Sequence, residues 1–314
     1  MAYYTGVCNS FEDIKAALIS HCVANGWIST TDSGGNDVIY KDNLYVMLKV
    51  LSYAFMITGR TGINEGNAPQ AVGIINFKDG EGYVGSVQFP VRYFCFTYND
   101  IDEIYFLINY LDMYQWIAFG KSNITLPGTG LWVAGTAGNP SSLTYIPEKI
   151  TMSVTGEISW FRDISPGLFW FSTTDYSDQY TAYRNYWLHS NINSSYPWSL
   201  TRDNHRTYAT IGIKYLTTHL QSQPNAFNQQ SMLLPVLAYH VSNTYLGYYT
   251  LVANIQKARH IMINYLDPET IIYHGSEQWM VFPYFRKVYQ SPTTFSLQFA
   301  DHTGNFGWAI KKEA

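Results

Sequence analysis

The chain has 314 residues, which is long enough for one large domain or two ordinary ones. Its formal net charge is −4, so a basic surface for nucleic acid is not expected. Charged residues make up 13% of the chain and aromatic residues 17%. This composition excludes intrinsic disorder, because disordered chains are charge-rich and poor in aromatics.

The abundance of aromatic residues has two explanations. With 27 Tyr and few charges, the composition resembles that of surfaces where proteins meet, which are rich in aromatics and poor in Lys and Glu. It also suits the Tyr- and Thr-rich surface of an extracellular β-protein. Composition alone leaves both open.

Targeting and redox signals are sparse. The N-terminus lacks the basic and apolar stretches of a signal peptide, and the most apolar run, 104–119, is interrupted by polar residues. No membrane insertion is therefore expected. Three cysteines leave one over from any disulfide. Cys22 and Cys95 fall in helical and strand patterns, so we expect both to be small buried side chains.

The first predicted element is a helix that begins after Ser10. Ser10 and Asp13 form an approximate capping box, and Gly26 is placed to end the helix. The apolar residues recur at helical spacing and predict the buried face. They are Phe11, Ile14, Leu18 and Cys22.

From residue 37 onward, short apolar segments separated by turn residues predict antiparallel strands. A Gly-rich loop is expected at 59–70. In the first half of the chain the predicted strands are 38–40, 44–50, 52–58, 91–98, 104–110 and 114–119. In the second half they are 233–240, 247–253, 260–264, 270–273 and 278–282.

The domain organisation follows from two segments that interrupt this pattern. Residues 120–150 are rich in Gly, Pro, Ser and Thr and are expected to form a domain boundary or a long exposed loop, and 221–231 form a polar linker. We therefore predict an N-terminal helix with an antiparallel β domain at 1–130, a loop-rich aromatic middle at 131–231 and a C-terminal β region at 232–314. The predicted fold class is mainly β, α+β only at the N-terminus: antiparallel, β-sandwich-like sheets with one N-terminal helix and long aromatic-rich loops.

The C-terminal segment has the pattern of a buried strand. Phe306, Trp308 and Ile310 alternate with Gly307 and Ala309. One face of this strand is therefore bulky and is expected to enter the core, while the other admits close approach of another backbone. The polar residues 311–314 are expected to end the chain in solvent.

Motifs for catalysis and for cofactors are missing. The chain has no nucleophile elbow, no phosphate-binding loop and no dinucleotide fingerprint, and its eight histidines form no metal-binding spacing. Residues 99–103 cluster carboxylates but lack the spacing of a calcium loop, so a solvated acidic turn is expected. We expect no enzyme activity, no cofactor and no metal.

Residues 160–198 hold the densest group of aromatics. Asp175 and Asp178 among them suggest a glycosidase pair on aromatic platforms, but residues three apart in a loop fix no carboxylate separation. An interface role suits the aromatics at least as well, because Tyr and Trp supply contact area at low entropic cost. The candidate interface residues are Trp170, Tyr176, Tyr180, Tyr183, Tyr186, Trp187, Tyr196 and Trp198.

Three segments together resemble a known family. They are 104–122 (IYFLINY and YQWIAFGKS) with the PGTG turn at 127–130, 265–287 (YLDP and GSEQWMVFPYFRK) and 302–310 (HTGNFGWAI). With ANGW at 24–27, they resemble virion structural proteins of tailed bacteriophages, which are carried among the tail and baseplate genes. The likeness spans both ends of the chain and is weakest at 140–240.

This resemblance implies a structural component of a bacteriophage tail, at the baseplate or tail tip, that assembles in multiple copies. The implied partners are other tail or baseplate proteins and copies of itself, and the implied location is the virion after synthesis in the host cytoplasm. It implies no catalytic residue. The alternative is a phage receptor-binding or glycan-binding adhesin, which uses the aromatics of 160–198 to bind a host-surface glycan.

Overall fold

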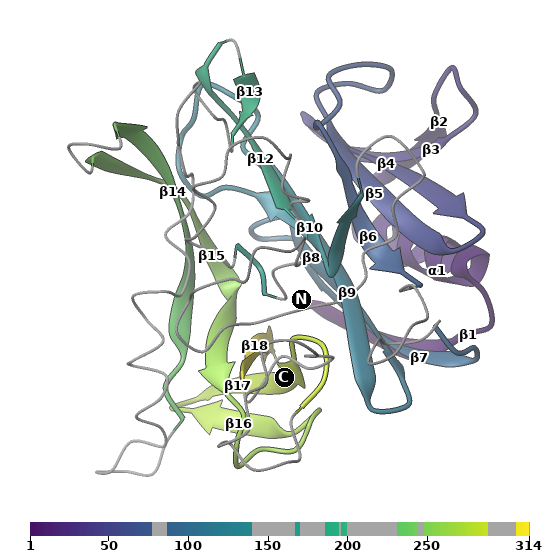
Figure 1. The fold of residues 1–314 in the computed structure, drawn as a ribbon, viewed down its shortest axis with the longest axis vertical. Coiled ribbons are helices and arrows are strands. Elements are labelled where there is room, and N and C mark those ends of the chain that lie inside the picture. The colour runs from purple at the N-terminus through teal and green to yellow at the C-terminus, as the bar shows by residue number, and fades with distance from the viewer. Residues whose placement is uncertain are drawn as a thin grey trace, which may run out of the picture.

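The computed structural model describes residues 1–76, 87–139, 167–169, 186–194, 196–199, 231–243, 248–287 and 306–313. In this part of the chain all paired strands are antiparallel and form three sheets, accompanied by one helix near the N-terminus (Figure 1). The predicted fold class is thereby confirmed. No helix among the described residues is long and apolar enough to cross a membrane.

Helix α1 (Phe11–Ala24) follows the sequence prediction closely. The Ser10 hydroxyl accepts a hydrogen bond from the Asp13 amide at 3.1 Å, which caps the first turn. All four residues of the predicted apolar stripe are buried. Gly26 adopts a φ of 86°, a conformation that favours glycine. It lets the chain turn from the helix into the strand at Ile28–Thr31.

Helix α1 packs against strands β4 and β5 of a six-stranded sheet. This sheet has the order β11-β6-β5-β4-β3-β2. Strands β3, β4 and β5 form two successive hairpins, as the alternation of apolar segments and turns predicts. The strands are β2 (Ile28–Thr31), β3 (Asp37–Lys41), β4 (Leu44–Leu51), β5 (Ala54–Arg60), β6 (Ala71–Ile75) and β11 (Ala137–Asn139).

A seven-stranded sheet forms the middle layer, with the order β1-β7-β8-β9-β10-β12-β13. The meander β7-β8-β9 is the one that the sequence predicts at 91–119. The strands are β1 (Ala2–Cys8), β7 (Val91–Tyr98), β8 (Glu103–Tyr110), β9 (Met113–Lys121), β10 (Leu131–Gly135), β12 (Tyr186–Asn193) and β13 (Tyr196–Ser199).

The third sheet is five-stranded, with the order β14-β15-β18-β17-β16. Its middle strand is the C-terminal one, so the prediction that this segment is integral to the fold is confirmed. The strands are β14 (Leu234–Asn243), β15 (Tyr248–Met262), β16 (Ile271–His274), β17 (Glu277–Pro283) and β18 (Phe306–Lys312).

Several expectations about element boundaries are wrong. Residues 120–150 are not a continuous loop, because β10 and β11 lie within them. The separate strands expected at 247–253 and 260–264 are one 15-residue strand, β15, whose polar middle hides its continuity in the sequence. Lys311 and Lys312 belong to β18 and pair with β17, so they do not end the chain in solvent.

The core connects the three sheets. One cluster of buried apolar side chains includes Ile14 of α1, Trp116 of β9, Val252 of β15 and Trp308 of β18. The expected boundary at 130/131 falls between β9 and β10, which pair directly. The division into three regions stays a prediction.

Candidate functional site

The most distinctive feature of the described chain is the seam between the seven-stranded and five-stranded sheets. The Trp116 and Trp308 rings lie 4.6 Å apart between centroids, and Tyr105 contacts Trp308 edge-on at 5.8 Å. All three side chains are fully buried. Strands that are far apart in the sequence, β8, β9 and β18, therefore share one aromatic core.

The seam continues along β17. Phe282 contacts both Phe94 and Tyr114 with its ring, at 5.3 and 6.0 Å. The Tyr114 amide donates to the Phe285 carbonyl at 2.7 Å, so the main chains also meet. The Arg286 guanidinium pairs with the Asp112 carboxylate at 2.6 Å. Edge-on and tilted aromatic contacts and polar contacts together fix one sheet against the other.

A bulge in β15 lies at the polar end of this seam. Pro235 faces Arg259 while the next residue, Val236, faces Ile255, so residues 256–258 have no partner on β14. An insertion of this kind leaves backbone N–H and C=O groups without their ladder partners. Other groups must satisfy them.

Glu103 on β8 supplies the acceptors for this bulge. Its carboxylate accepts from the amides of Gln256 at 2.9 Å and Lys257 at 3.0 Å, and from the Tyr105 hydroxyl at 2.7 Å. Only 2% of the residue is exposed. Burial raises the pKa of Glu103, and it raises that of Tyr105 well above its ordinary value.

Arg259 satisfies the carbonyl groups of the same bulge. Its guanidinium donates to the carbonyls of Ile255, Gln256 and Ala258 at 2.8–3.0 Å. The guanidinium also lies over the Trp279 ring at 5.2 Å, which holds it in place. Glu103 thus accepts hydrogen bonds from two amides of the bulge, and Arg259 donates to its carbonyls.

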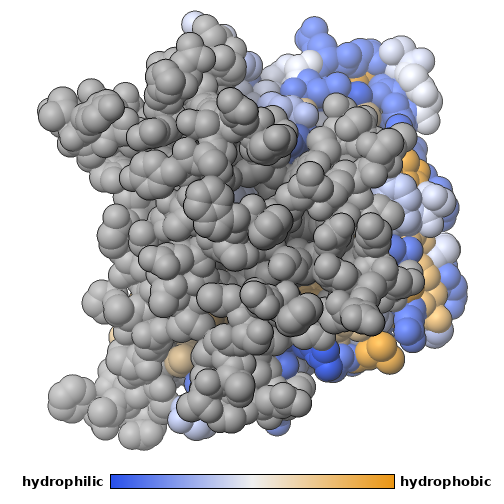
Figure 2. Space-filling view, viewed as in Figure 1, coloured by the Kyte–Doolittle hydropathy of each residue, from blue (hydrophilic) through white to orange (hydrophobic). Residues whose placement is uncertain are grey.

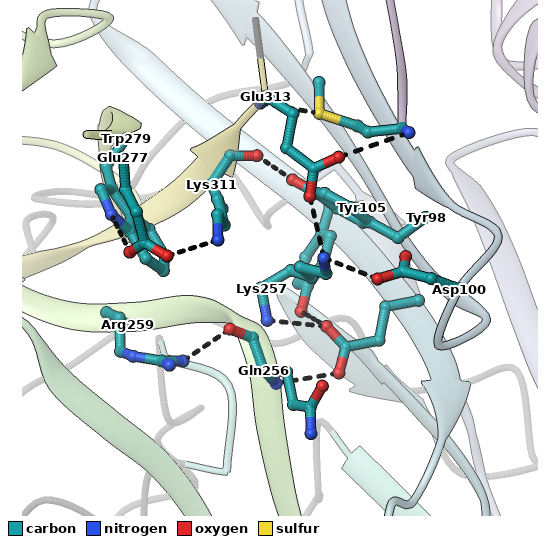
Figure 3. A network of polar contacts seen from close by, with 12 residues as sticks. Tyr98, Asp100, Tyr105, Gln256, Lys257, Arg259, Glu277, Trp279, Lys311 and Glu313 are labelled. Atoms are coloured by element: carbon teal, nitrogen blue, oxygen red, sulfur yellow. Dashed lines mark hydrogen bonds and ion pairs between the residues drawn. The ribbon is translucent and has the colours of Figure 1, made fainter.

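Lys257 joins this bulge to the chain end. Its ammonium pairs with Asp100 and with Glu313, both at 2.9 Å, and lies over the Tyr98 ring at 5.1 Å. Burial alone would lower the pKa of Lys257, but these two carboxylates raise it. The Tyr98 hydroxyl donates to the Lys311 carbonyl. Figure 3 shows these groups converging where the turn after β7, the strand β15 and the end of β18 meet.

The acidic cluster of residues 99–103 differs from the solvated turn that the sequence predicts. Asp100 pairs with Lys257, Asp102 pairs with Lys41 at 2.5 Å, and Glu103 is buried at the bulge. Asp100 and Glu103 thus both contact Lys257, through its ammonium and its amide, while Asp102 pairs with Lys41. Among the described residues, no group of three His, Cys, Asp or Glu side chains is placed to hold a metal ion.

A buried ion pair between Asp32 and Arg60 lies in the six-stranded sheet. Asp32 accepts from the Arg60 guanidinium at 2.8 Å and from the amides of Gly34 and Asn36. The hydrogen bonds from Asn36, then Arg60 and Gly34, lower the pKa of Asp32 to about 2. This pair closes the loop between β2 and β3 onto β5, and sequence reasoning missed it because the partners lie far apart in the chain.

The three cysteines are free and buried. Cys22 and Cys95 are fully buried, as their sequence patterns predict. Burial raises the pKa of the Cys8 thiol to about 11 and that of the other two as well. Since the thiolate is the reactive form, all three are inert at neutral pH.

The predicted aromatic interface is described only in part. Tyr186, Trp187 and Trp198 are buried against the chain's own core. The Trp198 indole donates to the Gly66 carbonyl at 3.0 Å, which ties β13 to the loop after β5. An interface role for the group stays a prediction. Trp170, Tyr176, Tyr180 and Tyr183, the side chain of Tyr196, and the Asp175–Asp178 pair lie outside the described residues.

One shallow hollow of about 290 Å³ opens beside the loop between β9 and β10. Its lining is mostly polar and includes Asn43, Lys121, Asn123 and Thr129. The loop is rigidly held, because the Ser122 hydroxyl donates to the Val252 carbonyl at 2.6 Å. The lining has no aromatic platform and no paired carboxylates, so its geometry supports neither sugar stacking nor acid–base chemistry.

Exposed apolar side chains lie elsewhere. In Figure 2 apolar residues gather at the right of the described surface, over the region where Figure 1 shows α1 and β1. Val7 of β1 and Val23 of α1 are 60% and 47% exposed.

The chain was compared with known proteins. No protein-family model and no curated protein matches it.

Proposed function

We propose that this chain is a structural component of a bacteriophage tail, at the baseplate or tail tip, which assembles in multiple copies. The proposal starts from the sequence resemblance. The structure adds one supporting observation: the segments that carry the resemblance pack against one another.

The support comes from the seam. Segment 104–122 contributes Trp116, segment 302–310 contributes Trp308, and the two rings are in contact. Segment 265–287 contributes Phe282, which contacts Tyr114 of the first segment. Pieces that are far apart in the sequence thus form one continuous scaffold. A likeness carried by a packed scaffold concerns the whole fold, as expected for a structural protein.

The chemistry of the described residues agrees with an architectural role. The buried carboxylates at the seam and in the first sheet are fully used in hydrogen bonds to neighbouring groups, as Glu103 and Asp32 illustrate. Such groups fix geometry. Both oxygens of each carboxylate already accept hydrogen bonds from the chain's own groups.

The test is the composition of purified phage particles from the host strain that carries this gene. Quantitative mass spectrometry should find the chain in the tail fraction, at several copies per particle. Particles that contain the other tail proteins in normal amounts but lack this chain would contradict the proposal.

A further inference from the structure

The edges of the three sheets differ in length. A sheet edge carries unpaired backbone groups, and proteins commonly protect it by keeping edge strands short or by placing charges or proline in them. Four of the six edge strands in the described chain have three or four residues: β2, β11, β13 and β16. The exceptions are β1 with seven residues and β14 with ten.

Strand β14 also lacks charged residues. No Lys, Arg, Asp or Glu occurs between residues 215 and 256, which includes all of β14 and the first part of β15. The one proline, Pro235, lies at its beginning. Two of the bulges in this hairpin place their extra residues on β15, so 236–241 of β14 run without an insertion. Short length, charge and proline therefore do not protect most of β14.

The other side of the same hairpin is protected. Strand β18 pairs only with residues 258–262 of β15, so residues 248–257 have no partner on β18. There the Ser122 hydroxyl binds the Val252 carbonyl at 2.6 Å, and the Asn123 side chain accepts from the Asn254 amide at 3.2 Å. The loop between β9 and β10 thus covers the edge of β15. In the described part of the chain, no strand pairs with the outer edge of β14.

We propose that the outer edge of β14 pairs with β14 of a second copy of this chain, antiparallel about a twofold axis. This rests on the proposed assembly in multiple copies and names the surface that makes the contact. In such a pair each residue near the axis faces its own copy, so a charge would repel its equal. A long edge without charges avoids this repulsion. The half-buried Leu237 and Tyr239 gain burial when the sheet continues across the axis.

The experiment is a charge-swap at the middle of β14. Wild type, Tyr239→Lys and Tyr239→Glu are compared by light scattering and analytical ultracentrifugation over a concentration series. The wild type should associate. The dissociation constant of each variant should rise by at least roughly tenfold, because like charges face each other across the axis. An equimolar mixture of the two variants should recover association, which identifies the partner as a second copy.

Val7→Lys on β1, the other long edge, is the matched control. It should associate like the wild type, and circular dichroism and thermal unfolding should show all variants folded. A monomeric wild type, an unaffected Tyr239→Lys, or a mixture that fails to re-associate would overturn the inference. Loss of association in Val7→Lys alone would assign the contact to β1. Presence of the chain in particles tests the proposed function separately, since it does not depend on β14.

Discussion

Strands β14 and β18 belong to the same sheet and each contains an apolar stretch, yet their surroundings differ. Strand β18 is paired on both sides, with β15 and β17, and residues Phe306 to Ile310 are all buried. Strand β14 is paired on one side, and several of its side chains are half-buried. Position in the sheet therefore decides whether an apolar strand segment is buried between two neighbours or keeps one unpaired edge.

The largest expected effect comes from removing the interior strand. A chain that ends at residue 305 loses Phe306, Trp308 and Ile310, whose burial is worth roughly 1.5–3 kcal/mol each. It also leaves β15 and β17 without the strand between them. The total is comparable to the net stability of a domain, about 5–15 kcal/mol. We expect insoluble or unfolded protein by solubility and far-UV circular dichroism.

A soluble chain ending at residue 305 that unfolds cooperatively near the wild-type temperature would contradict this. Removal of residues 311–314 gives the comparison. It deletes the Lys257–Glu313 pair and the β17 partners Lys311 and Lys312, so a folded but less stable protein is expected.

The next effect compares one side chain on an interior strand with one on an edge strand. Trp308→Ala empties a site at the centre of the seam, and we expect a loss of about 3–5 kcal/mol in the free energy of unfolding. Tyr273→Ala on the edge strand β16, where 64% of the side chain is exposed, should cost less than about 0.5 kcal/mol. Denaturant titration measures both. Equal losses would show that Trp308 is not part of a packed core.

A smaller effect is expected at the bulge. Glu103→Ala leaves the amides of Gln256 and Lys257 and the Tyr105 hydroxyl without their acceptor, at a cost of roughly 2–4 kcal/mol. Asp100→Ala, which removes an exposed partner of Lys257, should cost under about 1 kcal/mol. Hydrogen exchange at residues 256 and 257 should rise in Glu103→Ala. Unchanged protection there would rule out Glu103 as the acceptor.

The smallest effect is dependent on pH and concerns Asp32. Its pKa in the folded chain is about 2, below its ordinary value of 3.8. A lowered pKa stabilises the fold above the ordinary value, and this contribution is lost as the pH falls toward 2. Asp32→Asn should therefore unfold at a lower temperature than the wild type at pH 7, and the difference should shrink between about pH 4 and pH 2. A difference that does not change with pH would contradict the role of the carboxylate.

The sequence predicted those parts of the fold that depend on local pattern. The cap at Ser10, the apolar stripe of α1 and the alternation in residues 306–310 depend on neighbours within a few positions, and all were confirmed. Strands β10 and β11 were missed because their Gly-rich surroundings are typical of loops and because each also pairs with a strand far away in the sequence, β10 with β12 and β11 with β6.

The polar part of the seam could not be predicted at all. Glu103 meets residues of β15 that lie more than 150 positions away, and the acidic run around it has the pattern of a solvated turn. Its burial depends on a bulge that only the pairing of β14 with β15 reveals. The predicted aromatic site lies mostly outside the described residues, so its interface role stays a prediction.

A density map of the intact phage particle is the decisive measurement. We expect several copies of this chain in the tail, enclosed by neighbours, with β14 of one copy beside β14 of another. A chain that is attached at one end, with its aromatic segment facing solvent, would favour the adhesin function. A particle without the chain would contradict a structural role in the tail.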